Sequence, residues 1–399
     1  MNSVAQSFER AKTLLEMQRP ADAERELRGL LAQDPQNALA HSLLALALIS
    51  QGDVTGAVDA AREGVRLAPD HWFPHYAAGQ VYHRVRQGDP ALAAARTALS
   101  LAPEQASVWE LVVRIHLLRC EWAYAADAAR RGLALAPEDS DLMSLLARAL
   151  NMLGEADQAR EAAARAVSLD PESATAHLMY GWVMLTRGDP RQAADAFREV
   201  LRLDPNLGEA RDLLVAALKE RNPLNRFLNR LRLRYRGGWW MVFLLPAVPP
   251  VVALFVLIAL LHWAAWVAES WTVLRLARSR ATSLLFEGAE ARTALICCGL
   301  AVAGVALLAL GVGLGLDTVG TAGATVMALV TPVQEAVHTG APAGRRVLYG
   351  WAVLLALTAV ASVLSGTFVP ALLAAYAALA TVWIAAGVRR LFRSGDVLP

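Results

Sequence analysis

The sequence has little of what metalloproteins, disulfide-rich domains and most enzymes require. Only three of its 399 residues are cysteine, and Cys120, Cys297 and Cys298 have neither metal-ligand spacing nor a disulfide framework. The phosphate-loop, zinc-protease, serine-hydrolase and dinucleotide-binding motifs do not occur in it. Residues 1–20 lack the apolar core of a signal peptide. We therefore expect no enzyme, no cofactor and no metal site.

Lysine is scarce as well. The chain has two lysines among its 38 basic residues, and this arginine- and alanine-rich composition is typical of a GC-rich bacterial gene. Residues 1–222 hold 24 basic and 30 acidic residues, whereas residues 223–399 hold 14 basic and 6 acidic residues. The acidic balance of the first half argues against nucleic acid as its partner, because phosphate binding needs a basic surface.

Prolines recur in the first half with a fixed period of 34 residues, at Pro35, Pro69, Pro103, Pro137, Pro171 and Pro205. Each is preceded, twelve residues earlier, by an alanine: Ala23, Ala57, Ala91, Ala125, Ala159 and Ala193. The residues 24 positions earlier are also small in five of six cases: Ala11, Ala45, Gly79, Val113, Ala147 and Gly181. A period of 34 is the length of a helix–turn–helix unit, so the small residues predict places where stacked helices approach closely.

Turn signals stand between the two helices of most units, as in Gly52-Asp53, Gly154-Glu155 and Gly188-Asp189. Three units depart from this pattern. Gln18 and Cys120 occupy the glycine position of the first and fourth units, and Gly88 comes two residues late in the third. We expect irregular turns in these three units.

This pattern resembles the tetratricopeptide repeat family over residues 4–207, with residues 181–205 as the nearest copy. The resemblance implies an all-α fold whose first part is a solenoid of six helix–turn–helix repeats. It also implies that the concave side of this solenoid holds peptide segments or partner domains. Residues 208–222 are amphipathic and are expected to form a capping helix, so the solenoid domain would span residues 4–222.

The resemblance places one face of each first helix on the concave side, and that face carries Tyr76, Gln80, His83, Arg84, Glu110, Arg114, Arg148, Asn151 and Trp182. Arg114 and Arg148 stand 34 residues apart, and arginines in register can bind the carboxylates of an acidic peptide. Two alternatives stay open. The face is only solvated, with pairs such as Glu110 and Arg114 four residues apart on one helix, or the solenoid serves as a spacer or dimerisation surface.

Four apolar stretches in the second half are long enough, or nearly so, to cross a bilayer: 294–316, 319–338, 347–365 and 368–388. Short joins between them indicate antiparallel hairpins, so residues 294–388 are predicted to form a bundle of four transmembrane helices. Arginines cluster in the expected hinge 223–238, between residues 275 and 292, at Arg345-Arg346 and in the tail 389–399. Because basic loops stay in the cytoplasm, the solenoid and the C-terminus are predicted on the cytoplasmic side of a bacterial inner membrane.

Residues 239–268 allow two interpretations. Both flanks are basic, so a proline-broken hairpin that enters and leaves on one side agrees with the arginine pattern. A single plain span through the same residues is the alternative. Residues 269–293 mix apolar and basic positions and are expected to form an interfacial helix on the cytoplasmic leaflet.

Two features within the apolar stretches are candidates for function. The glycines Gly299, Gly304, Gly311, Gly313 and Gly315 predict close helix packing, with a pore lining as the alternative. Glu335 and His338 are ionisable and share a helix face. Such a pair can be half of a metal site in a bundle, but no second pair occurs, so a capping role or an interhelical hydrogen bond is the stronger interpretation.

These features favour a membrane-anchored adaptor: a cytoplasmic solenoid that binds a protein, and a lipid-embedded part that localises it. The partners expected are a protein or peptide, with an acidic segment as one option, and the lipid bilayer. The alternative is a regulatory or core subunit of a membrane transport or channel complex, which would need a polar path through the bundle. The sequence does not set the oligomeric state.

Overall fold

The computed structural model describes residues 3–223, 226–228, 231, 249–278 and 288–392. Its described regular elements are all α-helices. The chain divides into two compact units, Met1–Leu213 and Leu214–Pro399. Most of the expected hinge, the first arm of the expected proline-broken hairpin and most of the expected tail lie outside the described residues.

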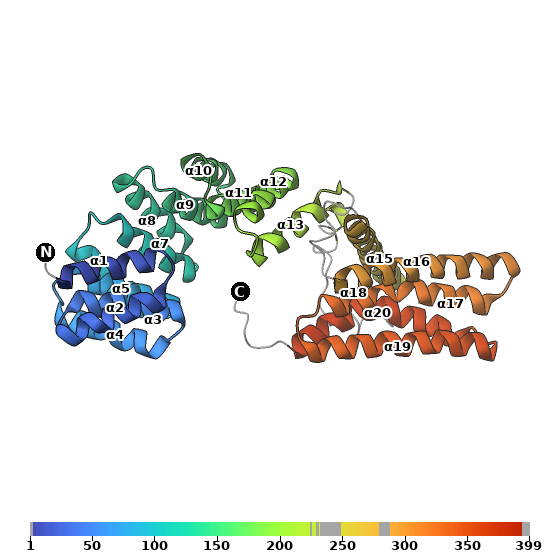
Figure 1. Ribbon diagram of the computed structural model, residues 1–399. Helices are drawn as coiled ribbons and strands as arrows, with labels where there is room; N and C mark the ends of the chain where they lie inside the picture. The colour runs from blue at the N-terminus through green and yellow to red at the C-terminus, as the bar shows by residue number, and fades with distance from the viewer. Residues whose placement is uncertain (1–2, 224–225, 229–230, 232–248, 279–287, 393–399) are drawn as a thin grey trace. The chain divides into compact units, whose positions relative to one another are not determined.

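The first unit consists of consecutive helical hairpins (Figure 1). Its helices are α1 (Ser3–Glu16), α2 (Pro20–Gln33), α3 (Ala38–Gln51), α4 (Val54–Leu67), α5 (Trp72–Arg84), α6 (Gly88–Leu101), α7 (Ala106–Leu118), α8 (Trp122–Leu135), α9 (Ser140–Leu153), α10 (Ala156–Leu169), α11 (Ala174–Arg187), α12 (Pro190–Leu203) and the start of α13 (Gly208–Glu220). Six hairpins therefore precede α13. This confirms the all-α repeat architecture that the proline period predicts.

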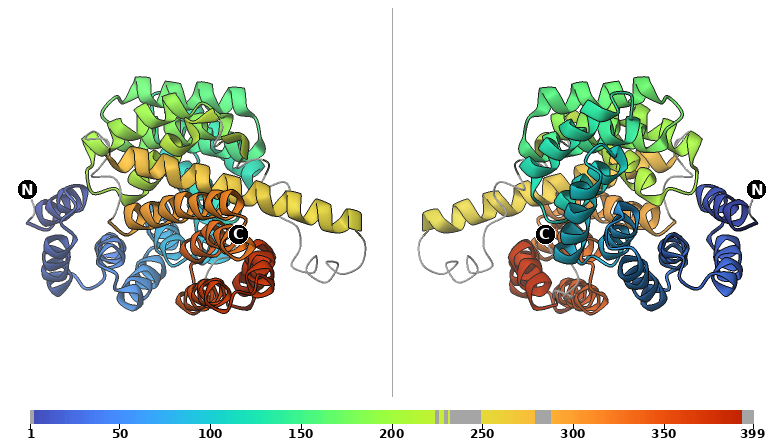
Figure 2. Two further views of the ribbon diagram at one scale, coloured as in Figure 1. Left: turned by 90° about the vertical axis from the view of Figure 1, so that its right-hand side faces the viewer. Right: turned by 90° about the vertical axis from the view of Figure 1, so that its left-hand side faces the viewer.

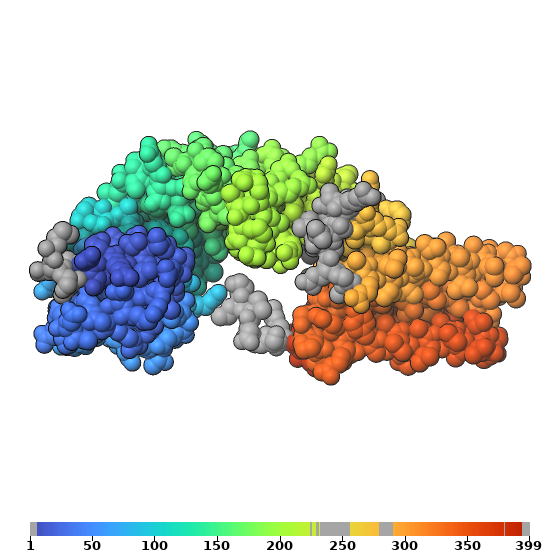
Figure 3. Space-filling view, in the orientation of Figure 1, coloured from blue at the N-terminus to red at the C-terminus, as the bar shows by residue number. Residues whose placement is uncertain are grey.

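The hairpins stack so that the first helix of each one packs against the first helix of the next, as α3 does against α5 and α9 against α11. Each second helix also packs against the following first helix. Among the described residues, no two successive second helices pack together to a similar extent. Because successive first helices pack together and the described successive second helices do not, the stack curves toward the first helices. The first helices thus form the inner layer of the solenoid. Figure 3 shows the stacked hairpins as one continuous body.

Small side chains hold the helices together at the predicted positions. The six alanines that precede the repeat prolines by twelve residues are all fully buried. Gly181 shows why size matters: a Cβ atom there would lie 2.6 Å from the Phe197 ring. The prediction of close helix contacts at these sites is confirmed.

The turns between paired helices are more regular than expected. Gly52, Gly154 and Gly188 adopt φ angles of 82–87°, in the left-handed region. Gln18, Arg86 and Cys120 occupy equivalent places and adopt φ angles of 58°, 59° and 58°. The expectation of irregular turns is therefore wrong, because the packing of the two helices imposes the left-handed conformation whatever residue stands there. Gly88 lies beyond this position and begins α6.

The second unit contains the end of α13 and a group of apolar helices (Figure 1). They are α15 (Pro249–Arg278), α16 (Gly288–Leu314), α17 (Asp317–Ala328), α18 (Val330–Val337), α19 (Pro342–Ser365) and α20 (Val369–Leu391). Among the described residues, three stretches could cross a membrane by length and composition: Val256–Arg278, Glu290–Leu314 and Pro342–Ser365. A fourth candidate in α20 is bent by 51° between Val369–Ala378 and Ala380–Leu391.

The expected span 319–338 is not one helix, because it breaks at Leu329 into α17 and α18. Pro332 explains the break, since proline has no N–H to donate to the carbonyl of Ala328. At the same place, the indole of Trp263 donates a hydrogen bond of 2.8 Å to the Met327 carbonyl. A side chain from a neighbouring helix thus provides a hydrogen bond to a backbone carbonyl at the break, as an apolar environment requires.

The expected interfacial helix over residues 269–293 also differs from the structure. Residues 269–278 continue α15 without interruption, residues 279–287 lie outside the described residues, and residues 288–293 form the first turns of α16. The apolar run that precedes residue 269 draws these residues into one helix of 30 residues.

Close glycine contacts join α16 to α17. A Cβ atom at Gly304 would lie 2.6 Å from the Met327 nitrogen, and one at Gly323 would lie 2.5 Å from the Leu308 nitrogen. Gly311 faces the backbone of Gly320 in the same way. By contrast, Gly313 has no heavy atom within 4 Å of its Cβ position. The packing interpretation therefore describes Gly304 and Gly311 but not every glycine of the series.

We expect Cys120→Gly to stabilise the solenoid by about 0.5–1 kcal/mol, because glycine removes the left-handed strain but costs more chain entropy. Gly154→Ala, at the equivalent turn, should destabilise it by about 1 kcal/mol. Urea unfolding of the detergent-solubilised chain, followed by circular dichroism, measures both. An unchanged midpoint for both variants would contradict the account of the turns.

Gly311→Leu should destabilise the α16–α17 hairpin by about 1–3 kcal/mol, since the new side chain has no room against Gly320. Gly313→Leu serves as the matched control and should leave stability unchanged. Thermal unfolding in detergent distinguishes the two. Equal melting temperatures for the two variants would show that this glycine contact is not important for the hairpin.

Candidate functional site

Five of the predicted groove residues form one cluster on the inner layer, which we call the inner patch: Tyr76, Gln80 and His83 from α5 and Glu110 and Arg114 from α7. Gln80 donates a hydrogen bond of 2.9 Å to the Tyr76 hydroxyl. Arg114 donates to Glu110, with Nε 2.8 Å from the carboxylate oxygen. The patch therefore contains both a neutral and a charged hydrogen-bonded pair.

Helix geometry explains why these residues share a face. On α5, Tyr76, Gln80 and His83 follow a spacing of four and three residues, which is one stripe of an α-helix. The opposite stripe of α5 carries His75, Ala78 and Tyr82, which line a cavity between α4 and α6. The 34-residue period then places Glu110 and Arg114 on α7 at the positions equivalent to Tyr76 and Gln80.

Burial and charge both shape the patch. Burial raises the pKa of the Tyr76 hydroxyl, so Tyr76 is a neutral hydrogen-bonding group. The pKa of His83 is lowered, mainly by burial and further by Arg114, Arg84 and Arg86. The Nδ1 atom of His83 is buried and has no hydrogen-bond partner. A neutral imidazole thus lies beside Arg114, with its Nδ1 atom buried away from solvent.

The remaining predicted residues do not join this cluster. Arg84 and Arg148 are exposed, and Trp182 is half-buried on α11. Asn151 accepts a hydrogen bond of 2.8 Å from the Thr186 hydroxyl, which connects α9 to α11. The two arginines expected in register therefore differ, because Arg114 forms an ion pair with Glu110, whereas Arg148 is exposed to solvent.

The outer side of the solenoid has cavities that were not predicted. One, of about 410 Å³, lies between α4, α5 and α6, and another, of about 400 Å³, lies between α8, α9 and α10. A third, of about 400 Å³, lies between α1 and α2. The lining residues of the first two are equivalent and stand 68 residues apart, as Ala78 and Leu146 do. In the repeat between them, Tyr124 stacks on His116 with ring centroids 5.6 Å apart and lies over the equivalent place.

A repeated ring contact marks this outer side and could have been found from the sequence. His41, His75, Trp109 and His177 each stand six residues after a repeat proline. The ring nitrogen of each donates to that proline's carbonyl at 2.8–3.0 Å. Met143 occupies the same position in the fifth repeat and has no such donor. These contacts fix the start of each first helix and are structural.

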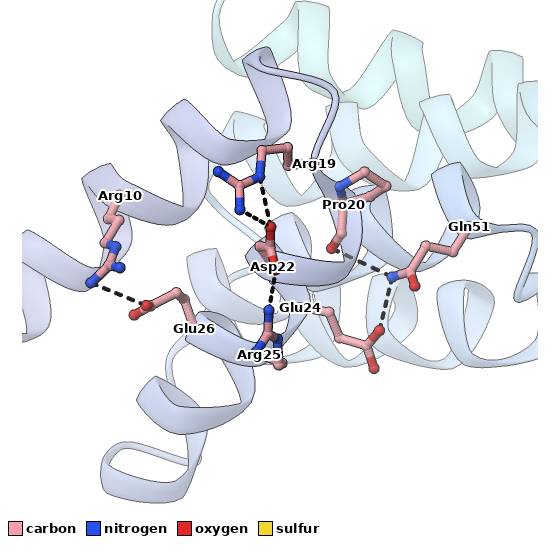
Figure 4. A network of polar contacts seen from close by, with 8 residues as sticks. All are labelled: Arg10, Arg19, Pro20, Asp22, Glu24, Arg25, Glu26 and Gln51. Atoms are coloured by element: carbon pink, nitrogen blue, oxygen red, sulfur yellow. Dashed lines mark hydrogen bonds and ion pairs between the residues drawn. The ribbon is translucent and has the colours of Figure 1, made fainter.

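Charged residues also gather on α1 and α2 (Figure 4). Asp22 lies between Arg19 and Arg25, and these arginines lower its pKa. Glu24 accepts a hydrogen bond of 2.8 Å from Gln51, which with Arg28 lowers its pKa. The arginines are more than half exposed, so these are surface ion pairs, which contribute little to stability or specificity.

In the second unit, the predicted polar residues are paired with other helices. Glu335 is almost fully buried and forms an ion pair with Arg389 of α20. His338 lies 3.5 Å from Glu269 of α15, and Gln334 donates a hydrogen bond of 2.6 Å to the Ser270 hydroxyl. A cavity of about 40 Å³ adjoins these groups. No group of three metal-ligating side chains occurs within the described part of the chain.

We expect the acid sensitivity of the solenoid to depend partly on His83. Because folding lowers the pKa of His83 below 6.5, the unfolded chain binds a proton that the folded chain resists. Its contribution to stability is therefore present above pH 6.5 and is lost as the pH falls toward the lowered value. His83→Gln should lose less stability between pH 7 and pH 5 than the parent chain in parallel urea titrations. Identical losses in both proteins would contradict this assignment.

The tetratricopeptide repeat family model matches residues 8–71 and 144–208. Among solved structures, the Cut9–Hcn1 hetero-tetramer of APC/C matches 54% of this chain and 42% of its own chain, at 19% identity and a TM-score of 0.48. PilF of Pseudomonas aeruginosa matches 52% of this chain and 95% of its own, at 19% identity and a TM-score of 0.44. PilW, a type IV pilus biogenesis factor, matches 54% of this chain and 100% of its own, at 18% identity and a TM-score of 0.47.

No curated protein matches the chain significantly. The structural likenesses are too distant to transfer any function to it. The matched residues fall at both ends of the stacked hairpins, and the same period continues through the hairpins between them. The first unit therefore contains tetratricopeptide repeats over the matched residues.

Proposed function

We propose that this protein is a membrane-anchored scaffold, in which the solenoid holds a segment of another protein and the second unit fixes it to a bilayer. The repeat fold supports protein–protein interaction, because stacked hairpins present an extended inner surface. The observation that carries the proposal is the inner patch, where Arg114 keeps N–H groups that the chain itself does not use.

The chemistry of the inner patch indicates what it would bind. Arg114 uses Nε and one terminal nitrogen on Glu110, and the second terminal nitrogen has N–H groups left to donate. His83 adds a neutral imidazole, and Tyr76 adds an aromatic surface. A segment with a carboxylate and an adjacent apolar side chain would use all three. Arg84 and Arg148, both exposed, would extend the preference for acidic residues along the inner layer.

The outer surface of the second unit supports anchoring. In the most apolar windows of α16 and α19, only 22% and 28% of the residues are buried within the unit. The exposed residues are large and apolar, among them Val302, Val312, Leu357 and Leu364. A soluble protein rarely leaves so much apolar surface in water, whereas lipid would cover it.

The ends of the bundle differ in charge, which supports an orientation. Gly344 of α19 lies beside Val388 of α20 and beside Phe392, which follows α20, so the basic pairs Arg345-Arg346 and Arg389-Arg390 share one end. The turns near Asp317 and Gly366 join the helices at the other ends of α16 and α19 and contain no arginine. We place the basic end, with the solenoid, in the cytoplasm and the bundle in a bacterial inner membrane.

A transport or channel role has less support. Such a role needs polar groups that face a continuous path, but Glu335, Gln334 and Thr325 bond to Arg389, Ser270 and the Ala371 carbonyl. The adjoining cavity, at about 40 Å³, has room for about one water molecule. The polar side chains therefore join helices to one another.

Photocrosslinking in living cells tests the scaffold function. A benzophenone amino acid at position 80 or 148 should capture one discrete partner, because both positions lie on the inner layer. The same amino acid at position 62 or 131, on exposed arginines of the second helices, should not. Capture from position 80 should fall at least tenfold in the Tyr76→Ala, Arg114→Glu double variant. Equal capture from all four positions would contradict the proposal.

A further inference from the structure

Helix α15 has the length and composition of a membrane span, but its direction differs from that of the other apolar helices. In Figure 1, α16, α17, α19 and α20 run across the page, while α15 is seen almost along its axis. After a quarter turn, α15 extends across the view and the last two helices are seen end-on (Figure 2). Within the second unit, α15 therefore crosses the bundle.

The contacts of α15 agree with this crossing. Ile258 and Ala259 pack against Val382 and Trp383 of α20, and no other part of α15 joins that cluster. Sixteen residues further on, Leu274 packs near Ala294 of α16. These two ends of α15 are about 24 Å apart at 1.5 Å per residue. A helix parallel to α20 would contact it over a similar length, whereas α15 contacts only a short stretch.

Helix α15 contacts each helix that it crosses near the same end of the bundle. Between its two ends, Trp266 packs with Cys297 and Val330, and Ser270 bonds to Gln334. On α20 the contacts lie toward Arg389, and on α16 they lie in its first half. This is the end that carries the arginine pairs. Helix α15 thus lies across the basic end of the bundle, a few helical turns below the arginine pairs.

The outward side of α15 forms one continuous stripe of apolar and basic residues. Leu257 and Leu260 are 65% and 44% exposed, and the half-buried Ala264 and Ala268 continue the stripe. Trp271, 60% exposed, comes next. Arg275 and Arg278 end it, both exposed and with no ion pair to a described acidic residue. Leucine, tryptophan and arginine are all side chains that the lipid interface accepts: leucine contacts acyl chains, tryptophan lies among the headgroups, and arginine reaches phosphates.

We infer that α15 does not cross the bilayer but lies in the membrane plane at the cytoplasmic interface, with anionic phospholipid covering its outward stripe. Leu257, Leu260 and Ala264 contact acyl chains just below the headgroups. Arg275 and Arg278 bind lipid phosphates. This inference rests on the proposed membrane anchoring. Lipid is favoured over a protein partner because the stripe is continuous in chemistry with the exposed apolar faces of α16 and α19.

An in-plane α15 removes the difficulty that both flanks of residues 239–268 are basic. A helix that lies along one surface begins and ends on the same side, so Arg275 and Arg278 join Arg345 and Arg389 there. Neither a proline-broken hairpin nor an outward-facing arginine cluster is then required for residues 249–278.

Spin-label depth measurement tests the inference. In a full-length chain with Cys120→Ser, Cys297→Ala and Cys298→Ala, single cysteines replace Leu257, Leu260, Ala264 and Ala268. Matched cysteines replace Val353, Leu357, Val360 and Leu364 of α19, which follow one exposed stripe over an equal length of twelve residues. Each variant is reconstituted in vesicles of phosphatidylethanolamine and phosphatidylglycerol. Collisions with oxygen and with a nickel chelate give the depth of each label.

We expect the four α15 labels to lie at one shallow depth, within a few ångströms of each other. The α19 labels should change depth along the helix, over a path of about 16 Å. An α15 profile that changes with position as the α19 profile does would overturn the inference and make α15 a span. Contact of the α15 labels with water or protein alone, beside a normal α19 profile, would also overturn it. Failure of the α19 labels to contact lipid would instead reject the anchoring itself.

Discussion

Close approach of helix backbones at small residues is the constraint on which both units depend. In the solenoid, a buried alanine in every second helix, twelve residues before each proline, sets the distance between paired helices. In the second unit, Gly304, Gly311 and Gly323 do the same for α16 and α17 without room for a single added carbon. In the solenoid these contacts recur every 34 residues, so the first helices stack regularly. The side chains on their concave side then form a continuous inner surface. Larger side chains at these places would separate the helices and disperse that surface.

The sequence was sufficient for the repeat fold because period and small-residue spacing are local properties. It was insufficient for the turns: Gln18, Arg86 and Cys120 adopt the left-handed conformation although their residue types do not favour it, because the packed helices leave no other path. Hydropathy likewise located most apolar helices but not their directions. The break at Leu329 follows from Pro332, a residue visible in the sequence, whereas the crossing of α15 depends on contacts between distant residues.

The candidate site was likewise predicted from the sequence only in part. Periodicity placed Tyr76, Gln80, Glu110 and Arg114 on one face, because a 34-residue repeat carries residue positions from helix to helix. It did not distinguish the paired Arg114 from the exposed Arg148, since pairing depends on whether an acidic residue stands four positions away. The two equivalent outer cavities were missed because they arise between neighbouring hairpins, where the size of a side chain such as Tyr124 decides whether space remains. Partner chemistry and membrane geometry are therefore the parts that need experiment.

The central claim is that a folded protein-binding solenoid is tethered to a membrane by the apolar helices that follow it. The most direct test is carbonate extraction of bacterial membranes that contain either the full chain or a chain that ends after Arg221. The account predicts that the full chain stays in the membrane pellet and that the shortened chain is released as a folded, protease-resistant protein. Release of the full chain into the supernatant would contradict it.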